Sequence, residues 1–235
     1  METMLLLASS VLPIYILGKS IYSADKEKES LKILIKLLIS GVFACILVLI
    51  LSIELGNFMP IFLKNTNNMN FLELIIYSFI CISLVEELCK YFMVYMTAYN
   101  NKEFNYTFDM IVYSVFTALG FAFLENILYV LTGGLTTAIA RAFTAIPAHA
   151  SNGVFMGIFL SKAKCYEVVD IKKSNKYKML AILVPTLIHG FYDMCAFSNE
   201  ILLLISFIAT LFTITIIYII KKQESDIKIS EYKIE

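Results

Sequence analysis

Seven long apolar runs, separated by short polar stretches, dominate this chain. A hydrocarbon core about 30 Å thick needs about 20 apolar residues per crossing helix, and the runs are of that order. Barrel strands are shorter and alternate in polarity, so the backbone groups of these runs must be satisfied within helices. With 59% hydrophobic and 16% charged residues, the sequence predicts an all-α, polytopic transmembrane helix bundle of about seven spans. The predicted spans are residues 4–22, 32–54, 71–98, 108–131, 137–161, 179–197 and 201–220.

The distribution of lysine predicts the orientation, because basic connections are retained on the cytoplasmic side. One alternate set of connections holds fifteen lysines, from Lys19 to Lys233, and the opposite set holds Lys64 alone. We therefore expect the N-terminus outside and the C-terminus in the cytoplasm. Residues 1–221 are predicted to form one transmembrane domain, and residues 222–235 a short charged cytoplasmic tail. The net charge is zero and spread over loops, so no nucleic-acid partner is expected.

Three charged residues stand close together in the third predicted span. Lys90 can reach Glu86 at i+4 and Glu87 at i+3 on one helix. A charge at bilayer depth costs about 2.5 to 3.5 kcal/mol, so such residues face the bundle interior and usually mark a functional site. One lysine cannot neutralise two carboxylates. The pattern indicates a second cation or metal nearby, or one glutamate that serves as a general base; a structural ion pair is the alternative, and the sequence does not say which glutamate is the base.

The chain has only two histidines, and both lie in apolar spans. His189 and Asp193 are one helical turn apart, so the carboxylate can share a metal or hold the ring in one tautomer. His149 precedes Gly153 and Gly157, a smooth stripe that permits close approach of a neighbouring helix or a substrate backbone. Pro147, just before His149, is expected to kink the helix.

Further polar residues flank the Gly133-Gly134 turn. Glu125 and Asn126 end the stretch Phe121 to Asn126 within the fourth predicted span, and Arg141 opens the fifth. Arg141 has three interpretations: it snorkels to the outer interface, balances Glu125 or Glu87, or stabilises an oxyanion.

Counting at about 1.5 Å per residue from the outer ends places four of these groups roughly 10 to 20 Å below the external surface. They are Glu125, His189, His149 and Glu86. Side chains from separate helices can therefore meet at one level, a combination that suggests metal-assisted or carboxylate-driven hydrolysis.

Four motifs in this order resemble those of the PrsW family, membrane proteases in a broader group with the CAAX prenyl proteases and bacteriocin-immunity-type proteins. Glu86-Glu87-Leu88-Cys89-Lys90 matches EExxK, Phe121 to Asn126 matches FxxxEN, Arg141 to Gly153 matches an Arg, Pro-x-His, Gly pattern, and His189 to Asp193 matches HxxYD. The resemblance covers about residues 80 to 195. It departs from the CAAX relatives at Glu125, where they carry histidine.

The resemblance implies an intramembrane peptidase in the bacterial cell membrane. It implies a single-pass membrane substrate, an anti-sigma factor cut at its first, extracytoplasmic-side site, so that later cuts release a sigma factor. The wider group includes metalloproteases and glutamate proteases that activate water without a metal. The resemblance thus leaves the chemistry open.

Our mechanistic hypothesis is that Glu86, supported by Glu87 and Lys90, takes a proton from the attacking water. His149 and His189 then hold either a metal or the oxyanion. Two histidines with Glu125 or Asp193 would make an open three-ligand site for Zn²⁺ or another divalent metal, which lowers the pKa of bound water to about 7.

Two other classes of protein remain compatible with the sequence. A proton-coupled transporter also places ionisable residues in its spans, but transporters often show internal repeats that this chain lacks. A non-catalytic receptor or immunity-type scaffold would use the same cluster for packing. The sequence identifies neither the scissile bond nor the oligomeric state.

Overall fold

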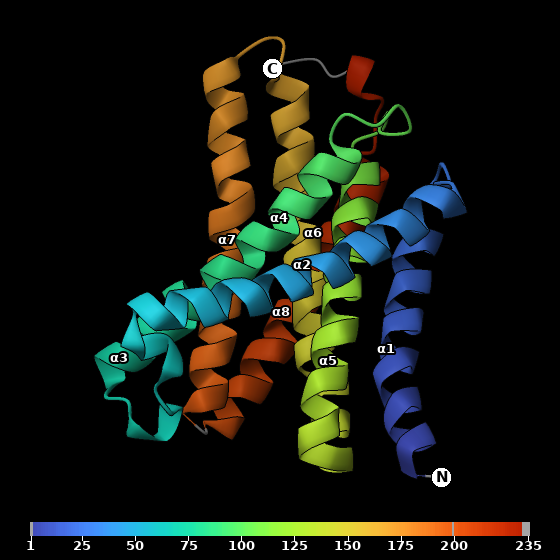
Figure 1. Ribbon diagram of the computed structural model, residues 1–235. Coiled ribbons are helices and arrows are strands. Elements are labelled where there is room, and N and C mark those ends of the chain that lie inside the picture. Colours follow the sequence, from blue (N-terminus) through green and yellow to red (C-terminus); the bar gives the residue numbers. More distant parts are fainter. Residues whose placement is uncertain (1, 199, 232–235) are drawn as a thin grey trace.

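A computed structural model describes residues 2–198 and 200–231 of the chain (Figure 1). The described residues are almost entirely helical and contain no β-strand; an isolated bridge joins Tyr106 to Lys228. The long helices are α1 (Glu2–Ala24), α2 (Leu31–Phe58), α5 (Asp109–Phe143), α6 (Ala145–Tyr166), α7 (Ile171–Phe197) and α8 (Ile201–Glu224). The shorter ones are η1 (Pro60–Leu63), η2 (Thr66–Asn68), α3 (Phe71–Ile76), the π-helical η3 (Tyr77–Leu84), α4 (Val85–Ala98) and η4 (Ile229–Glu231).

Helices cover every predicted apolar run, so the all-α membrane bundle is confirmed. The third predicted span, residues 71–98, coincides with the continuous succession of α3, η3 and α4. Among the described residues, four stretches are long and apolar enough to cross a bilayer by themselves. They are Leu31–Phe58, Asp109–Tyr166, Ile171–Phe197 and Ile201–Glu224. Seven crossings therefore stay a prediction.

The boundary between the fourth and fifth predicted spans differs from expectation. Gly134 breaks α5 with φ of 69°, a left-handed conformation that glycine adopts readily. A second break at Thr144 precedes α6, so the predicted span 137–161 begins in a short helical piece before that break. The kink expected from Pro147 is confirmed as this break at Thr144, because a proline ring clashes with the carbonyl four residues before it, here that of Phe143.

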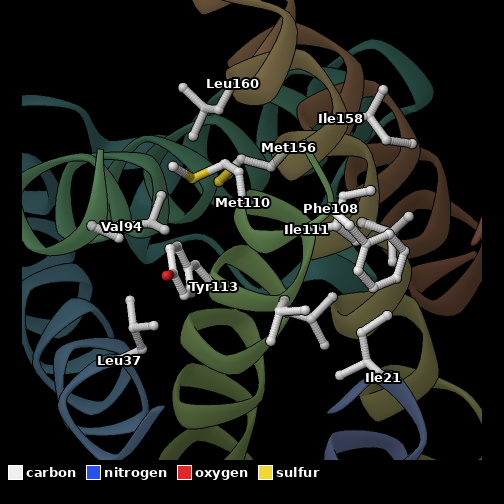
Figure 2. Packing of buried hydrophobic residues seen from close by; sticks show 14 of the residues in the cluster. Ile21, Leu37, Val94, Phe108, Met110, Ile111, Tyr113, Met156, Ile158 and Leu160 are labelled. Carbon is white, nitrogen blue, oxygen red and sulfur yellow. The ribbon is translucent and has the colours of Figure 1, made fainter. Parts of the chain in front are cut away.

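Helices α5 and α6 form the centre, and α2 and α4 cross them obliquely (Figure 1). Figure 2 shows buried side chains from these helices meeting, among them Leu37 of α2, Val94 of α4, Tyr113 of α5 and Leu160 of α6. The close helix approach predicted from the glycine stripe of α6 is confirmed, and the neighbour is α5. The packed core thus fixes the positions of the helices that carry the ionisable residues.

The lysine-bearing connections share one end of the bundle. The loops α1–α2, α4–α5 and α6–α7 lie with η4 at the top of Figure 1, and α3 and the N-terminal end of α1 lie at the opposite end. Helix α8 extends beyond residue 221, and the segment after it docks on the α4–α5 loop. Thr107 N donates to Ile227 O at 3.0 Å, and Ile229 N donates to Asn105 O at 2.8 Å. The predicted division at residue 221 stays a prediction.

We expect Gly157→Ala to destabilise the bundle by about 1 to 3 kcal/mol, a typical cost of overpacking. A Cβ atom at Gly157 would lie 2.5 Å from the Cα of Ile111, and a helix backbone cannot yield as a side chain can. Thermal unfolding in detergent measures the effect. Gly18→Ala is the matched control, because its Cβ would meet only side chains at ordinary contact distance, those of Leu119 at 3.6 Å and Phe116 at 3.8 Å. Equal melting temperatures for the two variants would contradict this account of the packing.

Candidate active site

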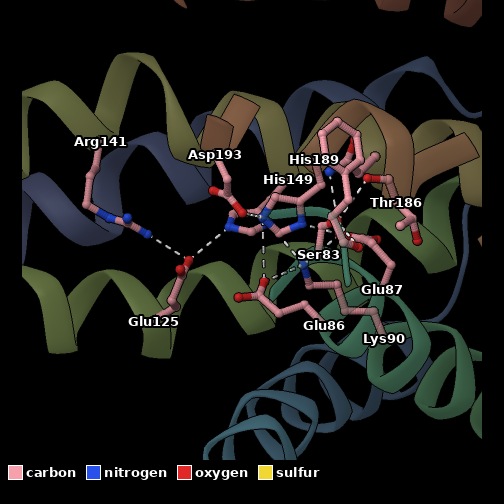
Figure 3. A network of polar contacts seen from close by, with 12 residues as sticks. Ser83, Glu86, Glu87, Lys90, Glu125, Arg141, His149, Thr186, His189 and Asp193 are labelled. Carbon is pink, nitrogen blue, oxygen red and sulfur yellow. Dashed lines mark hydrogen bonds and ion pairs between the residues drawn. The ribbon is translucent and has the colours of Figure 1, made fainter. Parts of the chain in front are cut away.

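The ionisable residues of four helices meet in one buried network (Figure 3). Rings of His149 from α6 and His189 from α7 lie 5.1 Å apart and nearly perpendicular. Glu86 and Glu87 come from the first turn of α4, and Glu125 from α5. The predicted convergence of Glu125, His189, His149 and Glu86 is therefore confirmed. Their depth below the membrane surface stays a prediction.

The π-helical segment η3 brings α4 against α7 just before the glutamates. Ser83 Oγ donates to Thr186 O of α7 at 3.0 Å. Gly190 lies so close to the Phe79 ring that a Cβ there would come within 2.5 Å of it. Single π turns are rare and often mark functional sites. These contacts fix the position of His189, one residue from Gly190, relative to Glu86 and Glu87.

One carboxylate oxygen of Glu87, Oε1, is engaged by three neighbours, while Oε2 is buried without a hydrogen-bond partner. Its Oε1 lies 2.9 Å from Lys90 Nζ and 2.9 Å from His189 Nδ1, and Asn152 Nδ2 donates to it at 3.5 Å. Because a carboxylate accepts, Nδ1 of His189 carries a proton towards Glu87, and Nε2 faces the carboxylates of Asp193 at 3.5 Å and Glu86 at 3.7 Å. Glu87 thus holds the His189 ring in one orientation.

Glu86, in contrast, borders a cavity. Its Oε2 lies 3.3 Å from Lys90 Nζ and 3.7 Å from His189 Nε2. It lines a cavity of about 320 Å³ between α2, η3 and α5, which Glu125 also lines. A water or a substrate segment in this cavity would contact Glu86 directly.

A chain of polar contacts runs from Lys90 to Arg141. Lys90 Nζ lies 3.1 Å from His149 Nδ1, and since lysine only donates, Nδ1 accepts and Nε2–H donates to Glu125 Oε2 at 2.8 Å. Arg141 donates to the same Glu125 oxygen at 2.7 Å and to Asn126 Oδ1 at 2.8 Å. The Arg141 side chain is 13% exposed and turned inward, so the snorkelling interpretation is wrong and the pairing with Glu125 is confirmed.

The network carries more acid than permanent base. Its carboxyl groups are those of Glu86, Glu87, Glu125 and Asp193, and its permanent cations are Lys90 and Arg141. Two carboxylates in this buried network therefore have no permanent countercharge. A divalent cation or added protons would balance them.

The donor atoms partly match the expected metal set. Glu86, His149 and His189 each offer one ligand atom, and these atoms lie within 4.8 Å of one another. Asp193 Oδ2 is buried without a hydrogen-bond partner, 3.5 Å from His189 Nε2. Glu125 is occupied by Arg141 and His149. The structure thus groups Glu86 with the two histidines, and Asp193 beside them.

The sequence analysis did not identify several residues and contacts of the buried network. Asn152 reaches Glu87, and Tyr192 OH lies 3.1 Å from Thr144 Oγ1 beside the break before α6. Lys90 Nζ lies 3.9 Å from the centroid of the Phe121 ring, a cation–π contact. Asn152 could have been identified as His149 was, because it is also a polar residue in an apolar span. The spacing of residues in the sequence did not predict the contact of Lys90 with the Phe121 ring.

Comparison with known proteins assigns the chain to a family. The model of the PrsW family intramembrane metalloproteases matches residues 29–220. A Protease PrsW of Oceanobacillus iheyensis is 31% identical over 224 residues, which are 94% of this chain and 98% of the relative. That of Clostridioides difficile is 33% identical over 215 residues, 88% and 87% of the two chains. That of Geobacillus kaustophilus is 42% identical over 123 residues, 52% and 53%. No solved structure matches the chain.

The matches to proteases extend over nearly the whole chain, which removes the support for the transporter and scaffold alternatives. They also include the helices that build the buried network. The chain belongs to the PrsW family of intramembrane metalloproteases and is a multi-pass protease of the bacterial cell membrane.

Proposed function

We propose that this protease cleaves a single-pass anti-sigma factor at its extracytoplasmic-side site, with Glu86 as the base that activates water. The observation that carries the proposal is the position of Glu86, which lines the cavity beside the two imidazoles. A general base must reach the proton that it removes, and Glu86 alone of the two adjacent glutamates lines this space. Glu87 is a positioning residue, because its Oε1 holds Lys90 and His189.

The proposed step balances as an ordinary amide hydrolysis. Glu86 takes a proton from water as the water oxygen bonds to the peptide carbonyl carbon. Lys90, 3.3 Å from Glu86, is a permanent cation beside this carboxylate and would stabilise the developing oxyanion. Glu86 then gives the proton to the amide nitrogen as the C–N bond breaks.

The residues present fit a divalent metal. His189 Nε2 lies 3.5 Å from Asp193 Oδ2, this oxygen has no hydrogen-bond partner, and the network has excess negative charge. We propose His149, His189 and Asp193 as the ligands, with Glu86 beside them and Glu87 and Glu125 orienting the two rings. Lys90 competes for Nδ1 of His149. A bound metal of this kind polarises a carbonyl and lowers the pKa of water.

The substrate class rests on the cavity and on the orientation. The cavity is walled by α2, η3 and α5 and includes exposed leucines of two predicted spans, Leu49 and Leu128. A substrate helix in the bilayer can therefore reach it sideways. The lysine-rich loops lie at one end of the bundle, which supports a cytoplasmic C-terminus.

Glu86→Gln should reduce cleavage by about 100-fold or more, the usual scale for loss of a general base. The measurement is an immunoblot of a tagged single-pass anti-sigma factor co-expressed with the protease, beside an unrelated single-pass protein. Glu73→Gln is the control, since Glu73 pairs with Lys64 outside the network at 2.6 Å. Unchanged cleavage by a folded Glu86→Gln protein would remove Glu86 from the chemistry. Equal cleavage of the unrelated protein would refute the substrate proposal alone.

Elemental analysis of purified protein tests the metal. We expect about one Zn²⁺ or other transition-metal ion per chain in the wild type and in Glu86→Gln, and none in His189→Ala, because only the last loses a proposed ligand. Loss of the ion in Glu86→Gln would make Glu86 a ligand. A fully active, metal-free wild type would remove the metal and leave the glutamate mechanism.

Reporter fusions test the orientation. A fluorescent protein that folds only in the cytoplasm should fluoresce when fused to the C-terminus of the full chain, and alkaline phosphatase there should stay inactive. The fifteen lysines on one side are the physical reason. Active phosphatase at the C-terminus would reverse the topology and place the lysine-rich loops outside.

A further inference from the structure

A second acidic cluster lies far from the candidate active site. Asp25 and Glu29 belong to the α1–α2 loop, and Asp109 is the first residue of α5. Each offers one carboxylate oxygen, and these oxygens lie within 4.8 Å of one another. Asp109 and Glu125 are sixteen residues apart on α5, so the two sites are separated by about 24 Å.

The cluster is buried, and much of its hydrogen-bonding capacity is unused. The exposed fractions of Asp25, Glu29 and Asp109 are 2%, 6% and 0%. Neither carboxylate oxygen of Asp25 has a hydrogen-bond partner, nor does Oδ1 of Asp109. The other oxygen of Asp109 accepts from the backbone N–H groups of Asn105 and Tyr106 at 2.9 and 2.7 Å. A buried carboxylate without a partner costs free energy, so an unpartnered Asp25 points to a missing ligand.

The nearest lysine does not pair with these carboxylates. Lys28 Nζ donates to the backbone carbonyls of Tyr22 and Ser23 at 2.8 and 3.0 Å, and to that of Asp25. Burial raises the pKa of Asp25 to about 6 and that of Glu29 to about 8, against the lowering effects of Lys28 on Asp25 and of the Tyr113 hydroxyl on Glu29. The acids therefore lack a countercharge within hydrogen-bond reach.

We propose that Asp25, Glu29 and Asp109 bind a divalent cation that prefers oxygen ligands, Ca²⁺ or Mg²⁺. Such ions take carboxylate oxygens at about 2.3 to 2.6 Å (Ca²⁺) or about 2.1 Å (Mg²⁺). Two oxygens on opposite sides of a Ca²⁺ ion are therefore about 4.8 Å apart, the upper limit of the spacing here. All three proposed ligands are carboxylate oxygens, which such ions prefer. The candidate active site differs, because its possible ligands include two histidine nitrogens.

The ion would join three segments of the chain. Asp25 and Glu29 fix the loop after α1, and Asp109 fixes the start of the helix that carries Glu125. The C-terminal segment contacts the same place, because Asp226 Oδ1 accepts from Thr107 Oγ1 and from Phe108 N, both at 2.9 Å. The site thus stabilises the lysine-rich end of the bundle, whatever substrate the protease cleaves.

Thermal unfolding of the full-length protein in detergent tests the proposal. After treatment with EDTA, added CaCl₂ or MgCl₂ at saturation should raise the melting temperature by about 5 °C or more. Asp25→Asn should abolish this rise. The variant loses no hydrogen bond and relieves charge repulsion, so in EDTA it should unfold at or above the wild-type temperature.

The matched control is Glu27→Gln, the same change on an exposed acid of the same loop. It should keep the full rise. No rise with either ion in the wild type would overturn the proposal, and a wild type stabilised only by lowering the pH would show that the cluster holds protons instead. An equal rise in Asp25→Asn would place the ion elsewhere and overturn it as well.

Discussion

The cost of burying charge in an apolar medium is the constraint on which the candidate site depends. An isolated ion at bilayer depth is expensive, so every acid and base carried into the bundle must find partners on other helices. Lys90 contacts two glutamates of its own helix and reaches His149 on α6. Arg141 forms an ion pair with Glu125 in which both side chains are largely buried. The contacts that neutralise these charges also fix the rotation of each of the four helices about its own axis. The same contacts therefore stabilise the bundle and set the geometry of the site.

Small residues make those contacts reachable. Gly41 of α2 and Gly120 of α5 face each other's helix backbones, and Gly153 and Gly157 of α6 do the same against α5. Without Cβ atoms these helices approach more closely than helices with larger side chains can. Only at such separations do short side chains such as Glu125 span the gap to the next helix at hydrogen-bond distance. The close approach of the helix backbones at these glycines thus sets the distances between the polar side chains of the network.

The sequence predicted the residues of the candidate site and the pairs within one helix, but few of the pairs between helices. Ionisable residues in apolar runs identified Glu86, His149 and His189, because hydrocarbon excludes such groups unless they have a role. Helical spacing predicts partners only within one helix, so the contact of Glu87 with His189, 102 positions away, was out of reach. The acids of the α1–α2 loop gave no signal, because in a loop a carboxylate normally faces water; Asp25 became notable only when its burial was seen.

The π-helical segment explains how two adjacent glutamates take different roles. Consecutive residues of an α-helix differ by about 100° in direction, so one glutamate can line the cavity while the next is enclosed. A π turn contains one residue more than an α turn, and that extra residue rotates everything after it by about the same angle. Segment η3 ends directly before Glu86 and Glu87. In a regular helix over residues 77–84 the two glutamates would point elsewhere, so the irregular segment decides which carboxylate lines the cavity.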